Sequence, residues 1–245
     1  MHLQSSKAAL LGDANFPTSA VAHYKDGRQL LIQDLYERYS SLAFTEPADR
    51  SVAILGLQER LSRTFTTKAA HGLFEAYFAR GLLWRRRDWQ RMRRIAQPSG
   101  RQVPSWSSLS KEGSIKYMDT TDQLRFKETA WATNDFKSPF TVSKGSTSMH
   151  EVIAFQGLTR RMHIPQTDML VYIKFDSDDD FEVNDLRCVV IGRDRSDGEE
   201  ESPKSHVLVI NQYRRPNGGH IWERVGVASL ISSVIDEKGE WVDIH

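Results

Sequence analysis

The sequence lacks most of the features that would assign it at once to a class of protein. It has one cysteine, Cys188, which excludes an internal disulfide and any metal site built from several cysteines. No apolar run approaches the roughly 20 residues that a membrane span needs. The first 17 residues have neither the basic region nor the long apolar stretch of a signal peptide. We therefore expect a cytoplasmic protein with no membrane span.

An excess of charge of either sign is also missing. The 33 Lys and Arg residues stand against 32 Asp and Glu residues, so the formal net charge is +1. This balance excludes a general polycation, although it allows local charged patches. Disorder is excluded in turn by the aromatic content of 6 Trp, 7 Tyr and 11 Phe, because these side chains need a folded core. A chain of 245 residues is long enough to bury such a core.

The composition predicts three regions. Residues 1–27 are expected to be partly flexible. Residues 28–100 show mostly helical spacing, which predicts helices over 30–39, over 49–65 with Asp49 as the N-cap, and from His71 through Trp84 to Gln97. Residues 101–245 form a β-rich part, and we expect it to make one continuous unit with the helical part.

The β-rich part consists of short apolar runs between turn signals. The predicted strands cover residues 114–118, 151–155, 169–175, 186–191, 206–210, 221–227 and 240–244. Turn residues separate them, as in the Pro-Asn-Gly-Gly run at 216–219. The spacing favours an antiparallel sandwich or barrel. The predicted fold class is therefore α+β, with a helical N-terminal part packed on an antiparallel β-rich C-terminal part.

The densest group of binding residues is the segment 84–94, which we call the Trp/Arg segment. It holds six arginines and two tryptophans, a combination that can grip phosphates while the aromatic rings stack on bases. The other interpretation is structural, with an apolar face on the core and the arginines in solvent or near a helix C-terminus. An acidic loop at 194–201 offers these arginines a partner within the chain. The candidate binding residues are Trp84, Arg85, Arg86, Arg87, Trp89, Arg91 and Arg94.

The sequence carries only weak signals for metal binding or for catalysis. The acidic run 176–182 resembles a calcium loop, but Phe181 stands where the turn glycine belongs, so a charged hairpin turn is the better prediction. Cys188 lies in a predicted strand, where a buried thiol packs rather than reacts. His206 and His220 could approach each other across a hairpin, but two histidines make no site. We predict no catalytic residue, no metal site and no cofactor.

Several short stretches, taken in order, resemble fungal heterokaryon-incompatibility (HET) domain proteins. Residues 35–45 (LYERYSSLAFT) and 49–57 (DRSVAILGL) are similar to the family's "Y-S … L-T … D-(K/R)-x-x-A-I-x-G" run. Residues 81–85 (GLLWR), 104–108 (PSWSS) and 113–115 (GSI) resemble its "L-L-W", "P-S-W-S-W" and "G-x-I" segments. Residues 207–210 (VLVI) and 223–228 (ERVGVA) resemble its closing strands. The matched positions of structural interest are Asp49, Trp84, Pro104, Trp106, Arg224 and Gly226.

The chain departs from the family pattern in three respects. Ser108 replaces the second Trp of "P-S-W-S-W", and the Trp that often precedes the "Y-S" run is missing around residues 28–31. The motifs "A-L-S-Y-x-W-G" and "R-x-W-(T/C)-x-Q-E" of the HET domain proper are also missing. The resemblance is therefore to the region C-terminal to that domain. It implies a fungal protein of non-self recognition and programmed cell death, with a protein partner or an upstream HET domain. The matched residues are explained by packing, with Trp84 and Trp106 as apolar anchors and Gly226 at a bend in a strand.

Three hypotheses about function follow. The first is a non-enzymatic regulatory or scaffolding region of a HET-like protein, which docks through charged surfaces. The second is a nucleic-acid-binding module that uses the Trp/Arg segment. The third is an enzyme whose site is assembled from distant residues, because catalytic groups are recognised by geometry rather than by adjacency.

Overall fold

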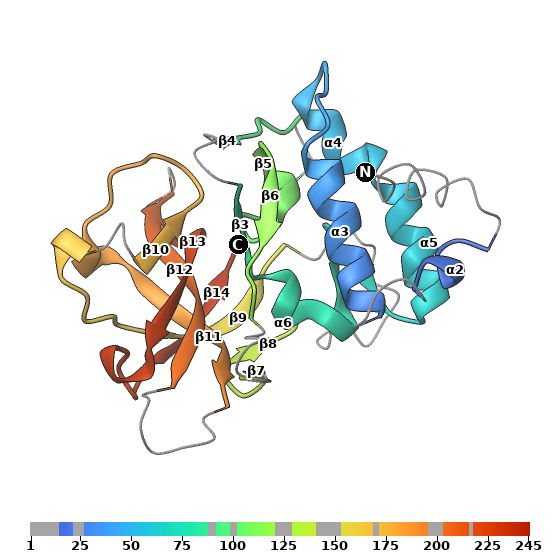
Figure 1. Cartoon of the computed structure of the whole chain (residues 1–245). Coiled ribbons are helices and arrows are strands. Elements are labelled where there is room, and N and C mark those ends of the chain that lie inside the picture. The colour runs from blue at the N-terminus through green and yellow to red at the C-terminus, as the bar shows by residue number, and fades with distance from the viewer. Residues whose placement is uncertain are drawn as a thin grey trace.

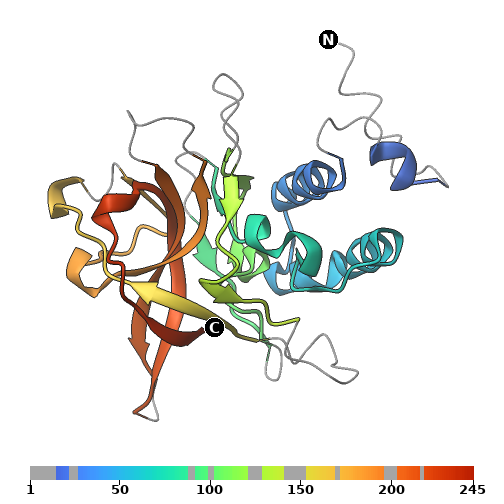
Figure 2. The same cartoon turned by 90° about the horizontal axis from the view of Figure 1, so that it is seen from below.

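The computed structural model describes residues 15–21, 27–87, 92–98, 102–120, 129–140, 153–168, 172–195, 203–215 and 218–245. Helices lie on one side of the molecule and a β-barrel on the other, with α6, β3 and β6 between them (Figures 1 and 2). This arrangement confirms the predicted α+β class. None of the helices in the described part of the chain is both long and apolar enough to cross a membrane.

The helical part begins with a short helix inside the predicted flexible segment. Within the described stretch 15–21, Phe16 and Ala20 are buried in the helical core. Residues 1–14 and 22–26 lie outside the described ranges. The predicted helix 30–39 is confirmed as α3. The helices are α2 (Thr18–Val21), α3 (Arg28–Ser40), α4 (Arg50–Ala53), α5 (Leu55–Phe65) and α6 (Phe78–Gly81).

The second predicted helix is broken into three pieces. It starts as a 3-10 turn over Pro47–Asp49, continues as α4 and resumes as α5. Asp49 occupies the N-cap position of α4, as predicted, but its side chain makes no capping hydrogen bond. The neighbouring Arg50 is buried instead, and its guanidinium donates to the carbonyl oxygen of Ser40. That bond ties the start of α4 to the end of α3.

The third predicted helix, from His71 to Gln97, is wrong. His71 and Gly72 have φ of 50° and 82°, which turns the chain into a hairpin between β1 (Ala69–Ala70) and β2 (Leu73–Phe74). Left-handed backbone at two successive residues cannot belong to a right-handed helix. The chain then passes through the four-residue α6 into the strand β3 (Trp84–Arg86), which pairs with β6 (Ile115–Tyr117).

The β-rich part is a barrel of five strands with further strands attached. Neighbouring strands pair in the order β11, β12, β13, β14 and β9, and the pairing of β9 with β11 closes the barrel. Its pairings are antiparallel except that between β13 and β14. The barrel strands are β9 (Phe155–Arg160), β11 (Arg187–Asp194), β12 (Lys204–Arg214), β13 (His220–Ile231) and β14 (Glu240–Ile244).

Smaller strands extend this framework. β10 pairs with β13, β7 pairs with β11, β8 pairs with β9, and β4 pairs with β5. Their bounds are β4 (Arg93–Arg94), β5 (Lys111–Glu112), β7 (Thr129–Trp131), β8 (Phe136–Lys137) and β10 (Ile173–Phe175). Of the predicted strand 151–155, residues 151–152 lie outside the described ranges, and β9 begins only at Phe155. Of the predicted strand 169–175, residues 169–171 lie outside those ranges, and residues 173–175 form β10.

The central strands β11 and β12 are buried on both faces. One face, with Val189 and Leu208, packs against Phe78 and Trp106 of the preceding part of the chain. The other face, with Cys188 and Val209, packs in a second cluster that includes β10. Burial on both faces explains why these strands are continuous apolar runs in the sequence rather than alternating ones.

Candidate functional site

The Trp/Arg segment is not a helix in the part that the structure describes. Trp84, Arg85 and Arg86 form β3, and Arg93 and Arg94 form β4. Trp84 is fully buried in the helical core, and its indole Nε1 donates to the carbonyl oxygen of Trp106 at 2.9 Å. Trp89 and Arg91 lie outside the described residues.

Two arginines of this segment form ion pairs within the chain. Arg86 contacts Asp178 at 2.6 Å, and Arg94 binds Glu223 through two hydrogen bonds of 2.7 and 2.9 Å. The bond to Glu223 raises the pKa of Arg94. The predicted acidic partner at 194–201 is not observed in the described residues. Asp194 binds His206 instead, and residues 196–202 lie outside those ranges.

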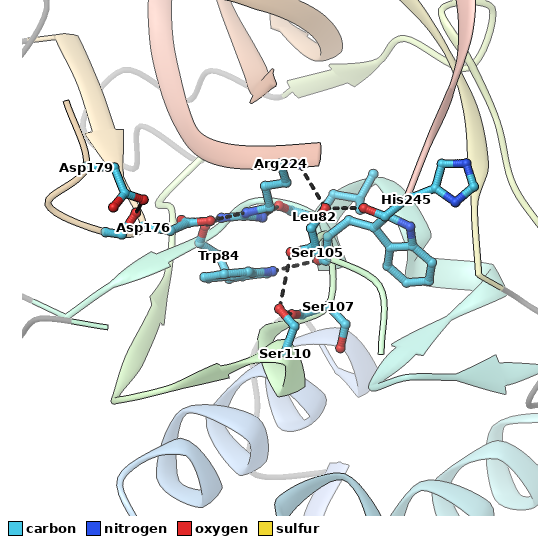
Figure 3. Close-up of polar contacts among 11 residues, drawn as sticks. Leu82, Trp84, Ser105, Ser107, Ser110, Asp176, Asp179, Arg224 and His245 are labelled. Atoms are coloured by element: carbon cyan, nitrogen blue, oxygen red, sulfur yellow. Dashed lines mark hydrogen bonds and ion pairs between the residues drawn. The ribbon is translucent and has the colours of Figure 1, made fainter. Parts of the chain in front are cut away.

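The strongest polar arrangement is centred on Arg224 of β13, which we call the Arg224 junction (Figure 3). Its guanidinium binds Asp176 at 2.8 and 3.1 Å, and both side chains are fully buried. It also donates to the carbonyl oxygen of Leu82 at 2.5 Å and to that of Trp84. The guanidinium carbon lies 3.4 Å from the centre of the Trp84 ring. Burial lowers the pKa of Arg224, and Asp176 opposes that shift.

Ser105 connects the Arg224 junction to the C-terminal strand. Its Oγ accepts the backbone N–H of Arg224 at 2.8 Å and donates to the carbonyl oxygen of His245. The next residue, Trp106, is fully buried against the rings of Phe78 and Phe155. The buried Pro104 precedes this pair. The "P-S-W" run therefore joins the helical part to the barrel.

Gly226 lies beside the Arg224 junction, at a point where strand β10 passes close to β13. A Cβ atom at this position would be 2.6 Å from the carbonyl oxygen of Lys174 in β10. The register of β12 with β13 also shifts between Val209 and Ile210, opposite this part of β13. A strand irregularity is thus present, as expected, but close approach is the stronger reason for glycine here.

The Arg224 junction gathers most of the positions that the sequence singled out. Trp84, Trp106, Arg224 and Gly226 lie in it or directly beside it, with Pro104 next in the chain, whereas Asp49 is exposed. The sequence alone places Asp176 in a charged turn, whereas the structure buries it fully. The missed signal is that the first carboxylate of the acidic run directly follows the apolar strand β10, while Arg224 is the one arginine within β13.

The remaining sequence candidates do not form a reactive centre. Burial raises the pKa of the Cys188 thiol to about 12, so the thiolate that a nucleophile needs is disfavoured. His206 and His220 pair with Ser229 and Arg214 respectively. Their positions are therefore eight residues apart along the ladder, about 26 Å, and they do not approach each other. No group of three metal-ligating side chains occurs among the described residues.

His206 takes part in an arrangement that the sequence did not predict. Its Nδ1 lies 2.8 Å from the Oγ of Ser229, and its Nε2 lies 2.8 Å from Asp194. His206 is only 5% exposed, so these bonds link three barrel strands rather than facing an open site. The arrangement fixes the end of β11 on β12 and β13.

A groove of about 680 Å³ opens beside the Arg94–Glu223 ion pair. Both polar atoms of the Gln97 side-chain amide are buried at its wall, and neither has a hydrogen-bond partner among the described residues.

Comparison with known proteins does not identify a relative, because no family model, no curated protein and no solved structure matches the chain.

Proposed function

We propose that the chain is a non-enzymatic regulatory or scaffolding region of a HET-like protein, which acts in fungal non-self recognition by holding a protein partner or an upstream HET domain. The observation that carries this proposal is the Arg224 junction. Residues of three separate motifs meet there in the protein interior, where they cannot reach a substrate. Each is explained by packing or hydrogen bonding, which supports a structural role for the motif set.

The charges of the Trp/Arg segment support the same proposal over nucleic-acid binding. The ion pairs with Asp178 and Glu223 place carboxylates at two of the arginines, and a phosphate would have to displace them. The exposed Arg87 and Arg93 remain as surface charges. Charged groups at a rim contribute to partner choice and to the rate of association.

Expression in a filamentous fungus tests the proposal. The chain is induced alone, as a fusion downstream of a HET domain, and as that fusion with Arg224→Gln, and each strain is scored by colony growth and vital-dye uptake. We expect healthy growth with the chain alone. We expect the fused wild-type chain to suppress the dye uptake that the HET domain causes by itself, and Arg224→Gln to abolish the suppression. The exposed-pair variant Arg94→Gln serves as the matched control and should retain it.

Two results would contradict the proposal. Death of cells that express the chain alone would assign it an activity of its own. The second result is binding to single-stranded RNA that weakens at least tenfold when the salt concentration rises a few-fold. If Arg87→Gln and Arg93→Gln abolish that binding, the chain is a nucleic-acid-binding module.

A further inference from the structure

A small charged cavity lies where β9, β11 and β14 meet, away from the Arg224 junction. It has a volume of about 330 Å³ and is lined mainly by charged side chains. These side chains are Arg160, Arg161, Arg187, Asp236, Lys238 and Glu240. Four cations thus face two carboxylates, and one of the carboxylates, Asp236, already binds His163 at 2.6 Å.

Arg160 is the buried base of this cavity. The residue is 7% exposed, its Nη2 binds Asp135 at 2.9 Å, and its Nε donates to the carbonyl oxygen of Glu237 at 3.3 Å. Its Nη1 is buried and has no hydrogen-bond partner among the residues that the structure describes. A buried donor on a charged group is costly when it has no acceptor. An acceptor supplied by a ligand in the cavity would remove that cost.

The pairing of β9 with β11 adds a second unfavourable arrangement. Cys188 lies opposite Arg160 and Val189 opposite Thr159. Continuation of this register by one residue places Arg187 opposite Arg161. Like charges on directly opposed residues are destabilising. The Nη1 of Arg187 donates to the carbonyl oxygens of Asn184 and Leu186, both at 2.8 Å, and an anion at the cavity would offset the like charges of Arg161 and Arg187.

The turn before β14 places a fourth cation at the cavity. A Cβ atom at Gly239 would be 2.2 Å from the carbonyl oxygen of Thr159, so the turn lies directly against β9. This close contact fixes Lys238 in the lining of the cavity. The cavity thus has cations on β9, on the neighbouring strand β11 and on the turn before β14.

We propose that this cavity binds a phosphate group. A phosphate ester carries about −1.5 to −2 charge at neutral pH. The lining presents four cations against two carboxylates, and with Asp135 bound to Arg160 one positive charge remains in excess, so an anion is favoured there. Arginine binds phosphate through paired N–H donors, and the Nη1 of Arg160 offers such a donor in a dry environment. The group can be free inorganic phosphate or the phosphate of a modified serine on a partner protein. The inference does not depend on the proposed scaffolding role.

Calorimetric titration of the full chain tests the site. The titrants are inorganic phosphate, a short phosphoserine peptide and the same peptide without phosphate, each at low salt. The variants are Arg161→Gln and Lys238→Gln, which remove exposed charges at the cavity. Arg160→Lys keeps the charge beside Asp135 but removes the Nη1 donor. The matched control is Lys204→Gln, which removes one exposed charge at the far end of β12.

We expect phosphate-dependent binding that each cavity variant weakens about tenfold and that Lys204→Gln leaves unchanged. A phosphopeptide that binds at least tenfold more tightly than inorganic phosphate identifies a modified partner, and equal affinities identify the free ion. If Arg160→Lys fails to fold, the two exposed variants still decide the result. Absence of binding by both phosphate ligands, or equal weakening by Lys204→Gln, would overturn the proposal.

Discussion

Arg224 and Arg94 each bind a carboxylate, but the two ion pairs differ in their exposure to water. Arg224 and Asp176 are fully buried, so water screens neither charge. The side chain of Arg94 is 62% exposed, so its bidentate bond to Glu223 competes with water. Exposed pairs contribute about 0 to 1 kcal/mol to stability, whereas removal of one partner of a buried pair costs about 3 to 5 kcal/mol.

We therefore expect Arg224→Gln to lower the free energy of unfolding by about 3 to 5 kcal/mol, because it leaves the Asp176 carboxylate buried without its partner. Arg94→Gln should lower it by no more than about 1 kcal/mol. Urea denaturation followed by tryptophan fluorescence measures both values. Replacement of both partners, as Asp176→Leu with Arg224→Met, should recover part of the loss. Equal effects of the two single variants would contradict the assignment of Arg224 as the buried centre.

The Cys188 thiol gives a pH dependence with a defined sign. Burial raises its pKa from 9.0 to about 12, so the folded chain keeps a proton that the unfolded chain releases between those values. Stability must then fall as the pH rises above about 9, with a slope of up to about 1.4 kcal/mol per pH unit from this group. Burial also raises the pKa of Tyr39 to about 12 and adds to the fall above pH 10.

Cys188→Ala tests this effect, because it removes the titrating group. The cavity that it creates lowers stability at every pH by a constant amount, so only the slope is diagnostic. Urea midpoints at pH 7, 9, 10 and 11 give that slope. We expect it to be shallower in the variant, and parallel curves for the two proteins would show that the buried thiol does not titrate as stated.

At the scale of elements, prediction from sequence succeeds where burial follows a simple pattern. The runs at 188–191 and 207–210 are apolar at every position because both faces of β11 and β12 are covered, and they lie in strands as predicted. The prediction fails between His71 and Gln97, where apolar spacing suits a helix but two left-handed residues start a hairpin. Backbone dihedral angles of single residues leave almost no trace in apolar spacing.

The candidate site, like the fold, could be predicted from the sequence only in part. The sequence identifies Trp84 and Trp106 as anchors, because large aromatic side chains seek the interior. It does not connect Arg224 with Asp176, which lies 48 residues away, directly after β10. Nor does it find Arg160 as the base of a cavity, since that depends on the register of β9 with β11. Local patterns predict what a residue prefers, but pairing across strands decides its partner.

Two glycines should respond in opposite directions to the same substitution. At Gly226 a methyl group would be 2.6 Å from the Lys174 carbonyl oxygen, so Gly226→Ala must displace β10 from β13. We expect a loss of about 1 to 3 kcal/mol, typical of overpacking. At Gly56 in α5 no atom lies within 4 Å of the added carbon, and Gly56→Ala should stabilise by up to about 1 kcal/mol. Chemical denaturation of both variants measures the difference, and destabilisation by Gly56→Ala would show an unrecognised constraint in α5.

At the scale of the whole molecule, the stretch from Leu82 to Trp84 belongs to two cores at once. Leu82 and Leu83 pack with Val189 and Leu208 of the barrel, whereas Trp84 packs in the helical core. Arg224 of the barrel then binds the carbonyl oxygens of Leu82 and Trp84. Neither part can open along this boundary without exposing apolar side chains and a buried charge.

We therefore expect the helical part and the barrel to unfold together. Far-UV circular dichroism reports mainly on α3 and α5, whereas tryptophan fluorescence includes Trp84 and Trp106 at the boundary. The two signals should give the same urea midpoint, and the calorimetric enthalpy should equal the van't Hoff enthalpy. Arg224→Gln should weaken the link, so the two midpoints should separate in that variant while Arg94→Gln keeps them together. Two transitions in the wild-type chain would mean that the helical part and the barrel are independent domains, because a shared core that holds them as one unit cannot melt in halves.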